Sequence, residues 1–257
     1  SGGSSNATVT GSGLLTLQPL TAGTNVGIAG GAGTFSLSAA DLTKFQDGFS
    51  EIRIGKADAG ALTVNGVSFT DNLRLLTAGN LAFNGILNVG ANRLALIIGG
   101  STTQSAAFTA ATLRLGGNGN FTLLNSGNDV DTLSKDGTGS LTFRDADSVA
   151  IGTVDGVNGL SGSTVEVRAN TNITAANTSV TTSGGAITLN SDRDATGGGN
   201  IQLTDTTITS NGGAITLGGG ADPLTTAAIG SGTGSLPQKI GVYFSNSSLL
   251  SGGGNIS

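Results

Sequence analysis

Pairs of apolar residues separated by one other residue recur along almost the whole chain. They are Leu15 and Leu17, Phe35 and Leu37, Ile52 and Ile54, Leu73 and Leu75, Leu94 and Leu96, Leu113 and Leu115, Leu141 and Phe143, Val165 and Val167, Ile187 and Leu189, and Ile215 and Leu217, with Ile256 at the end. Alternation at period two predicts short β-strands with one buried face. The steps between first members are 20, 17, 21, 21, 19, 28, 24, 22, 28 and 41 residues. A repeat with loops of variable length is typical of a solenoid.

Each step also contains further strand-like pieces, such as Leu81 and Phe83, separated by turns rich in Gly, Asn, Ser and Asp. A β-sandwich is the competing architecture, but it favours longer strands with varied connections. We therefore predict an all-β parallel β-helix (solenoid) of about ten coils, with three short strands per coil. Coils about 4.8 Å apart would make a rod about 48 Å long.

We expect residues 1–257 to form a single β-helix segment. Two stretches interrupt its periodicity, and we expect loop excursions near 125–136 and 218–239. Ser38 to Phe49 (SAADLTKFQDGF) is the one stretch with helical spacing, and Ser38 is placed to cap one or two turns. The chain opens on SGGSSNATVT and closes within another repeat, so we expect an internal fragment of a longer chain.

The composition narrows the possible chemistry. The chain has 45 glycines but no Cys, His, Met or Trp, and its net charge is −5. Triads that use histidine or cysteine, and zinc sites, are excluded. Lys44, Arg53, Lys56, Arg74 and Arg93 are scattered along the sequence, so we expect no nucleic-acid partner. No apolar run is long enough for a transmembrane helix, and we expect no transmembrane segment in this fragment.

Three pairs of aspartates are the remaining candidates for catalysis: Asp129 and Asp131, Asp145 and Asp147, and Asp192 and Asp194. A glycosidase needs two carboxyl groups about 5 to 9 Å apart, and residues i and i+2 of a strand satisfy that distance. The pairs stand in turn-rich sequence, however, and we interpret them as solvated turn residues. The calcium-repeat pattern G-G-x-G-x-D is nearest matched at Gly116 to Phe121, where Phe121 replaces the aspartate. We predict no catalytic, cofactor-binding or metal-binding residues.

The doublet GGAITL, at Gly184 to Leu189 and at Gly212 to Leu217, is interpreted as scaffold. We expect Ile187 and Leu189 to stack beneath Ile215 and Leu217, and GGGNIQL (Gly197 to Leu203) to form another face of the same coil. Four threonines should point outward: Thr188, Thr207, Thr209 and Thr216. Three asparagines that precede strands should bond along the stack: Asn172, Asn200 and Asn255.

The chain resembles the filamentous haemagglutinin-like exoproteins of two-partner secretion. The similarity covers nearly its whole length and rests on LLTLQPL (Leu14 to Leu20), GTFSLSAADL (Gly33 to Leu42), EIRIG (Glu51 to Gly55) and NIQLTDTTITSNGGAITL (Asn200 to Leu217). A single stretch, TLSKDGTGSLTF (Thr132 to Phe143), is similar to the repeats of autotransporter passenger domains. The resemblance implies a secreted, right-handed β-helix. The Asn-Pro-Asn-Gly motif of the family's secretion domain is absent from this sequence.

We expect a non-catalytic, rod-like adhesin segment that is secreted or displayed on a bacterial cell surface. Its expected partners are a host or neighbouring cell surface, extracellular matrix or polysaccharide. The first alternative is a structural subunit of an extracellular fibre, sheath or surface layer, because both ends are expected to lack a polar cap and could self-associate. The second is a β-helix enzyme that acts on polysaccharides.

Overall fold

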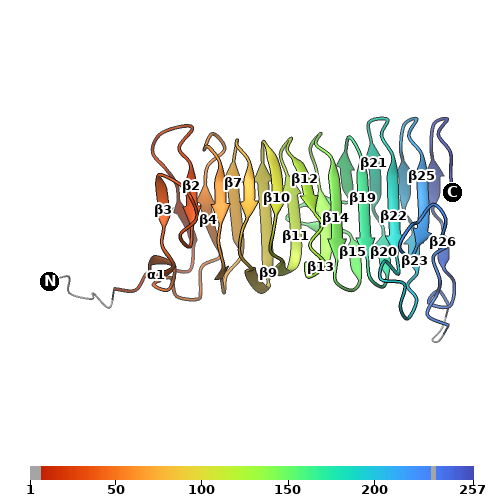
Figure 1. The fold of residues 1–257 in the computed structure, drawn as a ribbon, viewed down its shortest axis with the longest axis horizontal. Helices are drawn as coiled ribbons and strands as arrows, with labels where there is room; N and C mark the ends of the chain where they lie inside the picture. The colour runs from red at the N-terminus through yellow and green to blue at the C-terminus, as the bar shows by residue number, and fades with distance from the viewer. Residues whose placement is uncertain (1–6, 233–235) are drawn as a thin grey trace.

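The computed structural model describes residues 7–232 and 236–257. Strands from successive coils lie side by side along one axis, from the red end of the colour scale to the blue end (Figure 1). The strands form two long sheets in which every pairing is parallel, and one small antiparallel pair. The predicted all-β parallel β-helix is therefore confirmed.

The fifteen-stranded sheet consists of β1 (Leu14–Leu17), β4 (Glu51–Gly55), β6 (Val67–Ser68), β7 (Leu73–Thr77), β9 (Leu87–Ile98), β11 (Phe108–Gly116), β13 (Asp129–Lys135), β15 (Val149–Ile151), β18 (Leu160–Gly162), β20 (Ile173–Ala176), β21 (Ser179–Thr182), β23 (Ile201–Thr204), β24 (Thr207–Thr209), β26 (Val242–Ser245) and β27 (Ser248–Leu250). The ten-stranded sheet consists of β2 (Val26–Ile28), β3 (Phe35–Leu37), β5 (Leu62–Val64), β8 (Leu81–Phe83), β10 (Ser101–Gln104), β12 (Asn120–Leu123), β14 (Leu141–Asp145), β19 (Val165–Ala169), β22 (Ile187–Ser191) and β25 (Ile215–Gly219). The antiparallel pair is β16 (Thr153–Val154) with β17 (Val157–Asn158).

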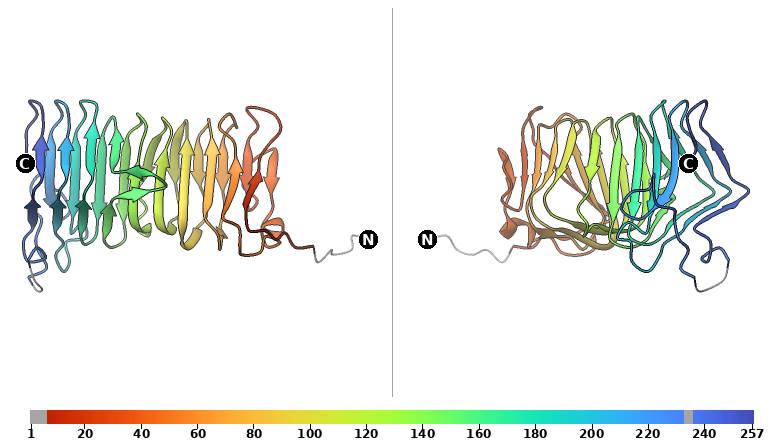
Figure 2. Two further views of the ribbon diagram at one scale, coloured as in Figure 1. Left: turned by 180° about the vertical axis from the view of Figure 1, so that it is seen from behind. Right: turned by 45° about the vertical axis from the view of Figure 1, so that its right-hand side comes forward.

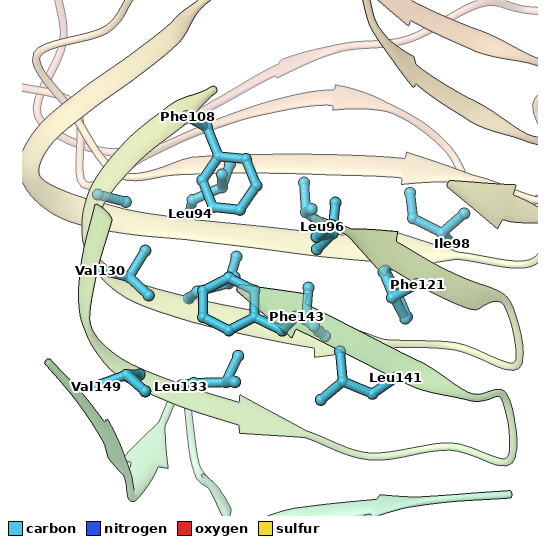
Figure 3. Close-up of a cluster of buried hydrophobic side chains, with 14 of the residues drawn as sticks. Leu94, Leu96, Ile98, Phe108, Phe121, Val130, Leu133, Leu141, Phe143 and Val149 are labelled. Atoms are coloured by element: carbon cyan, nitrogen blue, oxygen red, sulfur yellow. The ribbon is translucent and has the colours of Figure 1, made fainter. Parts of the chain in front are cut away.

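Inward side chains stack as columns that run the length of the rod. One column has ten rungs: Leu15, Ile52, Leu73, Leu94, Leu113, Leu133, Ile151, Ala175, Leu203 and Phe244. Figure 3 shows the central part of the core, where side chains from both sheets meet. There Phe108 and Phe143 pack with tilted rings whose centroids are 6.5 Å apart. The ten rungs confirm the predicted number of coils. A coil such as β19, β20 and β21 has the predicted three strands.

The apolar pairs in the sequence do not all belong to one sheet. From Ile52 to Leu115 they lie in the fifteen-stranded sheet, and from Leu141 onward they lie in the ten-stranded sheet. The 28-residue step from Leu113 to Leu141 therefore crosses from one sheet to the other. The true neighbour of Leu113 in the next coil is Leu133, which the alternation missed.

The GGAITL doublet stacks as predicted, because Ile187 pairs with Ile215 and Leu189 pairs with Leu217. The IQL of GGGNIQL begins β23, which lies in the other sheet and so forms another face of the coil. Asn172 bonds along the stack, because its Oδ1 accepts from the backbone N–H of Asn200 at 3.0 Å. Hydroxyl side chains alternate with inward neighbours on the outer faces, as at Thr188, Thr207, Thr209 and Thr216, although Thr216 is only 4% exposed.

The N-terminal end of the stack is covered only in part, because β1 and β3 each pair with a strand on one side alone in the part of the chain that the structure describes. The chain turns back after β2, so that β3 pairs with β2 on the side away from β5. The single helix of the described residues, α1 (Ala39–Leu42), follows at the same end (Figure 1). Ser38 accepts from the Asp41 backbone N–H, and Asp41 accepts from that of Ser38. This capping box confirms the predicted role of Ser38.

The expectation of a loop excursion near residues 125–136 is wrong. Residues 129–135 form β13, which pairs with β11 over most of its length. The alternation failed there because Lys135 occupies an inward position that holds leucine in the preceding coils. In the second expected region, β25 ends at Gly219 and the next strand, β26, begins at Val242. Residues 233–235 of that region lie outside the described residues.

Candidate functional site

An antiparallel hairpin lies across the outer face of the fifteen-stranded sheet (Figure 2). It is formed by β16 and β17, and Ser134 Oγ donates to the Val154 carbonyl at 3.3 Å. Ala95 and Ser134 alternate with inward residues, yet both are fully buried. The hairpin therefore covers part of the regular outer surface.

The sequence feature that indicates this hairpin is its turn, not the period-two alternation of apolar residues. Asp155 and Gly156 stand between Val154 and Val157, and both have positive φ, at 52° and 77°. An Asp-Gly pair of this kind is favoured in two-residue turns of twisted hairpins. The hairpin separates β15 from β18, which correspond to consecutive parts of β13 in the preceding coil.

The hairpin tip closes a cluster of charges. Asp155 accepts from Arg74 Nη2 at 2.5 Å and forms an ion pair with Arg93 Nη1 at 3.0 Å. Glu51, which is 7% exposed, pairs with Arg74, Arg93 and Arg53. Three of the basic residues that are scattered in the sequence thus meet on one face. Burial of Glu51 opposes ionisation, but the hydrogen bonds from the arginines outweigh it and hold the pKa of Glu51 below its ordinary value.

The predicted aspartate pairs are only partly brought together. Partial desolvation and the negative charges of Asp147 and Asp131 raise the pKa of Asp129. Asp145 is fully buried and accepts from the backbone N–H groups of Val130 and Asp147, each at 3.0 Å. Burial raises the pKa of Asp145 to about 8. A solvated turn residue was expected there, and that interpretation is wrong.

Asp192 is also buried, at 4% exposed, whereas Asp194 is exposed. Burial and the neighbouring Asp194 raise the pKa of Asp192. The side chain of Asp194 accepts from the backbone N–H of Thr196 at 3.1 Å, which orders the turn after β22. Neither Asp145 nor Asp192 is accessible to a polymeric substrate.

Lys135 places an ammonium group inside the rod. The residue is 1% exposed, and Nζ donates to the carbonyls of Gly139 and Ser161, each at 2.8 Å, and more weakly to those of Asp136 and Gly137. Burial lowers the pKa of Lys135 to about 8. The carbonyls satisfy the buried charge, which fits a structural group rather than a reactive one.

A segment after β25 folds back over the outer face of the ten-stranded sheet. We define residues 220–227 as the arch. The backbone N–H of Gly219 donates to the Thr226 carbonyl at 2.9 Å, and that of Gly220 donates to the Ser191 carbonyl at 3.1 Å. A Cβ added to Gly218 would lie 2.1 Å from the Pro223 carbonyl oxygen, so glycine is required for this approach.

The arch forms one wall of a groove of about 450 Å³, which we call the arch groove. Its floor includes Thr188 and Thr216, which pair in register, and the ion pair between Arg168 Nε and Glu166 Oε1 at 2.7 Å. Asp222, Pro223 and Leu224 line the arch side. The groove has the size of small-ligand sites.

Metal binding has no support among the residues that the structure describes. No group of three or more His, Cys, Asp or Glu side chains there is arranged to hold a metal ion. Phe121, which replaces the aspartate of the calcium-repeat pattern, is fully buried in the core. In the same residues, no helix has the length and apolar character needed to cross a membrane.

The fold and its surface define the chain as a parallel β-helix whose regular coils carry a clamped hairpin on one face and a grooved arch on another. No family model, curated protein or solved structure matches this chain.

Proposed function

We propose that this chain is a rod-like segment of a secreted or cell-surface adhesin, which presents contact surfaces without catalysing a reaction. The observation that carries the proposal is the unbroken ten-rung core beneath a surface interrupted by the hairpin and the arch. Parallel coils held by backbone hydrogen bonds and a continuous core form a stiff support for loops. The resemblance to filamentous haemagglutinin-like exoproteins supports the same function.

The geometry of the aspartates favours display over polysaccharide cleavage. A glycosidase needs two accessible carboxyl groups that flank the bond it breaks. Each pair that contains Asp145 or Asp192 has one carboxyl group buried in the rod. Asp129 and Asp131 are both exposed, but they project side by side from the outer face of β13. Neither of these two carboxyl groups lines the arch groove.

The two ends of the stack bear on the fibre-subunit alternative. Coils that stack between chains need free strand edges at both ends. At the N-terminal end, Phe49 packs into the core at 9% exposed, and the backbones of Val9 and Phe45 are bridged. Among the described residues, however, the outer edges of β1 and β3 have no strand partner, so the fibre subunit is the second candidate.

The proposal is tested by measuring the binding of the fluorescently labelled chain to epithelial cells, bacterial cells and matrix-coated beads by flow cytometry. We expect saturable binding to at least one of these surfaces, which unlabelled chain competes away. Absence of saturable binding to all three would contradict the adhesin proposal. Regular filaments with one subunit repeat in electron micrographs would favour the fibre subunit instead.

A further inference from the structure

The arch groove lies on a face of the rod that suits a ligand. The hairpin and its charge cluster cover part of the outer face of the fifteen-stranded sheet. On the ten-stranded sheet, outward threonines stand on many of the strands: Thr63, Thr103, Thr122, Thr142, Thr188 and Thr216. The arch converts one end of this hydroxyl-bearing face into a groove with a wall.

The wall is held in a fixed position. Asp222 Oδ1 accepts from the Leu224 backbone N–H at 3.1 Å, and the Asp222 carbonyl accepts from the backbone N–H of Thr226 at 2.9 Å. Together with the bonds at Gly219 and Gly220, these contacts tie the arch to β25 and β22. A preformed wall lowers the entropy lost when a ligand is ordered against it.

The lining offers hydrogen-bonding groups of both kinds. The Thr188 hydroxyl donates and accepts, the Arg168 guanidinium donates, and the Glu166 carboxylate accepts. Thr216 is 4% exposed and its hydroxyl bonds with that of Ser257 at 3.2 Å. Ala186 and Ala214 of the floor and Pro223 of the wall add apolar surface between these groups. A ligand that carries many hydroxyl groups on an apolar ring framework matches this mixture.

The charge of the lining selects among such ligands. Glu166 and Asp222 are acidic and Arg168 is basic, which gives a formal charge of −1. The whole chain is also acidic, with a net charge of −5. Repulsion between like charges disfavours sulfated or carboxylated glycans.

We propose that the arch groove binds a neutral oligosaccharide, through Thr188 and the Arg168–Glu166 pair on the floor and the arch as the wall. The proposal rests on the proposed display function, for which it names the chemistry of the contact. An extended peptide is a poorer occupant, because it would need an open strand edge. The backbone of β22 is already paired with β19 on one side and β25 on the other.

The test is a titration of the purified chain with cellohexaose, mannohexaose and galactohexaose, with a heparin hexasaccharide as the anionic comparison, followed by ligand-observed NMR. We expect at least one neutral hexasaccharide to bind more tightly than the heparin fragment. Thr188→Val keeps the size and strand preference of the side chain but removes its hydroxyl, and Arg168→Gln breaks the ion pair. Each should weaken that binding at least about 10-fold, the loss expected for one or two hydrogen bonds.

Thr63→Val is the matched control, because Thr63 is a threonine at an outward position of the same sheet, far from the arch. It should leave the affinity within about 2-fold of the unmodified chain, since it removes no contact with the ligand. Circular dichroism should show all variants folded, and if Arg168→Gln does not fold, Thr188→Val alone decides. The proposal is overturned if none of the neutral hexasaccharides binds, if Thr188→Val binds as the unmodified chain does, or if the heparin fragment binds most tightly.

The two proposals fail separately. If the chain binds cells but none of the neutral hexasaccharides, the groove proposal falls and the adhesin proposal stands. If it binds a neutral hexasaccharide in a Thr188-dependent way but attaches to no surface, the groove proposal stands and the adhesin proposal falls. Loss of both kinds of binding in Thr188→Val supports both.

Discussion

Lys135 is the charged member of an otherwise apolar column. The column runs through Leu17, Ile54, Leu75, Leu96, Leu115, Lys135, Leu160, Val180, Ile208 and Leu249. Its ammonium also lies 6.0 Å from the centroid of the Phe121 ring. A buried charge is tolerated here because four backbone carbonyls surround it.

The lowered pKa of Lys135 predicts a stability that rises in alkaline solution. The folded chain loses the proton near pH 8, whereas the unfolded chain keeps it up to about 10.5. Between these values the unfolded chain binds more protons, so rising pH favours the folded chain. We expect the free energy of unfolding, relative to Lys135→Met, to rise by roughly 3 kcal/mol from pH 8 to 10.5. Denaturant titrations of both chains would contradict this if the difference stayed constant.

The raised pKa of Asp145 predicts that the free energy of unfolding falls with rising pH, in a lower pH range than the one set by Lys135. The folded chain keeps the proton of this carboxyl up to about pH 8, while the unfolded chain loses it near 3.8. The contribution of the Asp145 carboxyl to the free energy of unfolding is therefore greatest in acid and is lost as pH rises. Relative to Asp145→Asn, the free energy of unfolding should fall by at most roughly 4 kcal/mol between about pH 4.5 and 7.5. A difference between the two chains that does not change over this pH range would contradict the assignment.

Among the elements, the hairpin is held at its tip by charge. Asp155→Asn keeps a residue that tolerates the positive φ of the turn but removes the pairing with Arg74 and Arg93. Because these groups are partly exposed, we expect a loss of only about 1 kcal/mol in global stability. Amide exchange over residues 152–159, followed by mass spectrometry, should accelerate about 10-fold as the hairpin opens locally. Unchanged exchange there would show that the ion pairs do not hold the hairpin.

The arch depends on the missing side chain of Gly218. Gly218→Ala would place a Cβ against the Pro223 carbonyl, so we expect the arch to move, with a loss of about 1 to 3 kcal/mol in stability. Gly13→Ala is the matched control, because no atom lies within 4 Å of the added Cβ. Amide exchange over residues 221–227 should accelerate in the first variant only. Equal exchange in both variants would contradict the assigned role of Gly218.

For the whole molecule, the repeat of apolar pairs was sufficient to predict the coil stack. It failed where an inward position holds a polar residue, because alternation then no longer marks the strand. Because Lys135 is charged, the alternation does not mark β13 as a strand. Asp145 likewise has the sequence surroundings of a turn residue, although it is the buried last residue of β14. The charge cluster could not be predicted, because Arg74 and Asp155 are 81 residues apart and meet only through the hairpin.

In the proposed function, the regular coils serve as scaffold and contact occurs where the arch interrupts the repeat. Hydroxyl-radical footprinting of the chain, free and bound to the surface it recognises, tests this assignment. We predict that protection is confined to the arch and to the neighbouring outward residues of β19, β22 and β25. Protection spread over the outer face of the fifteen-stranded sheet, or no protection at the arch, would contradict this assignment.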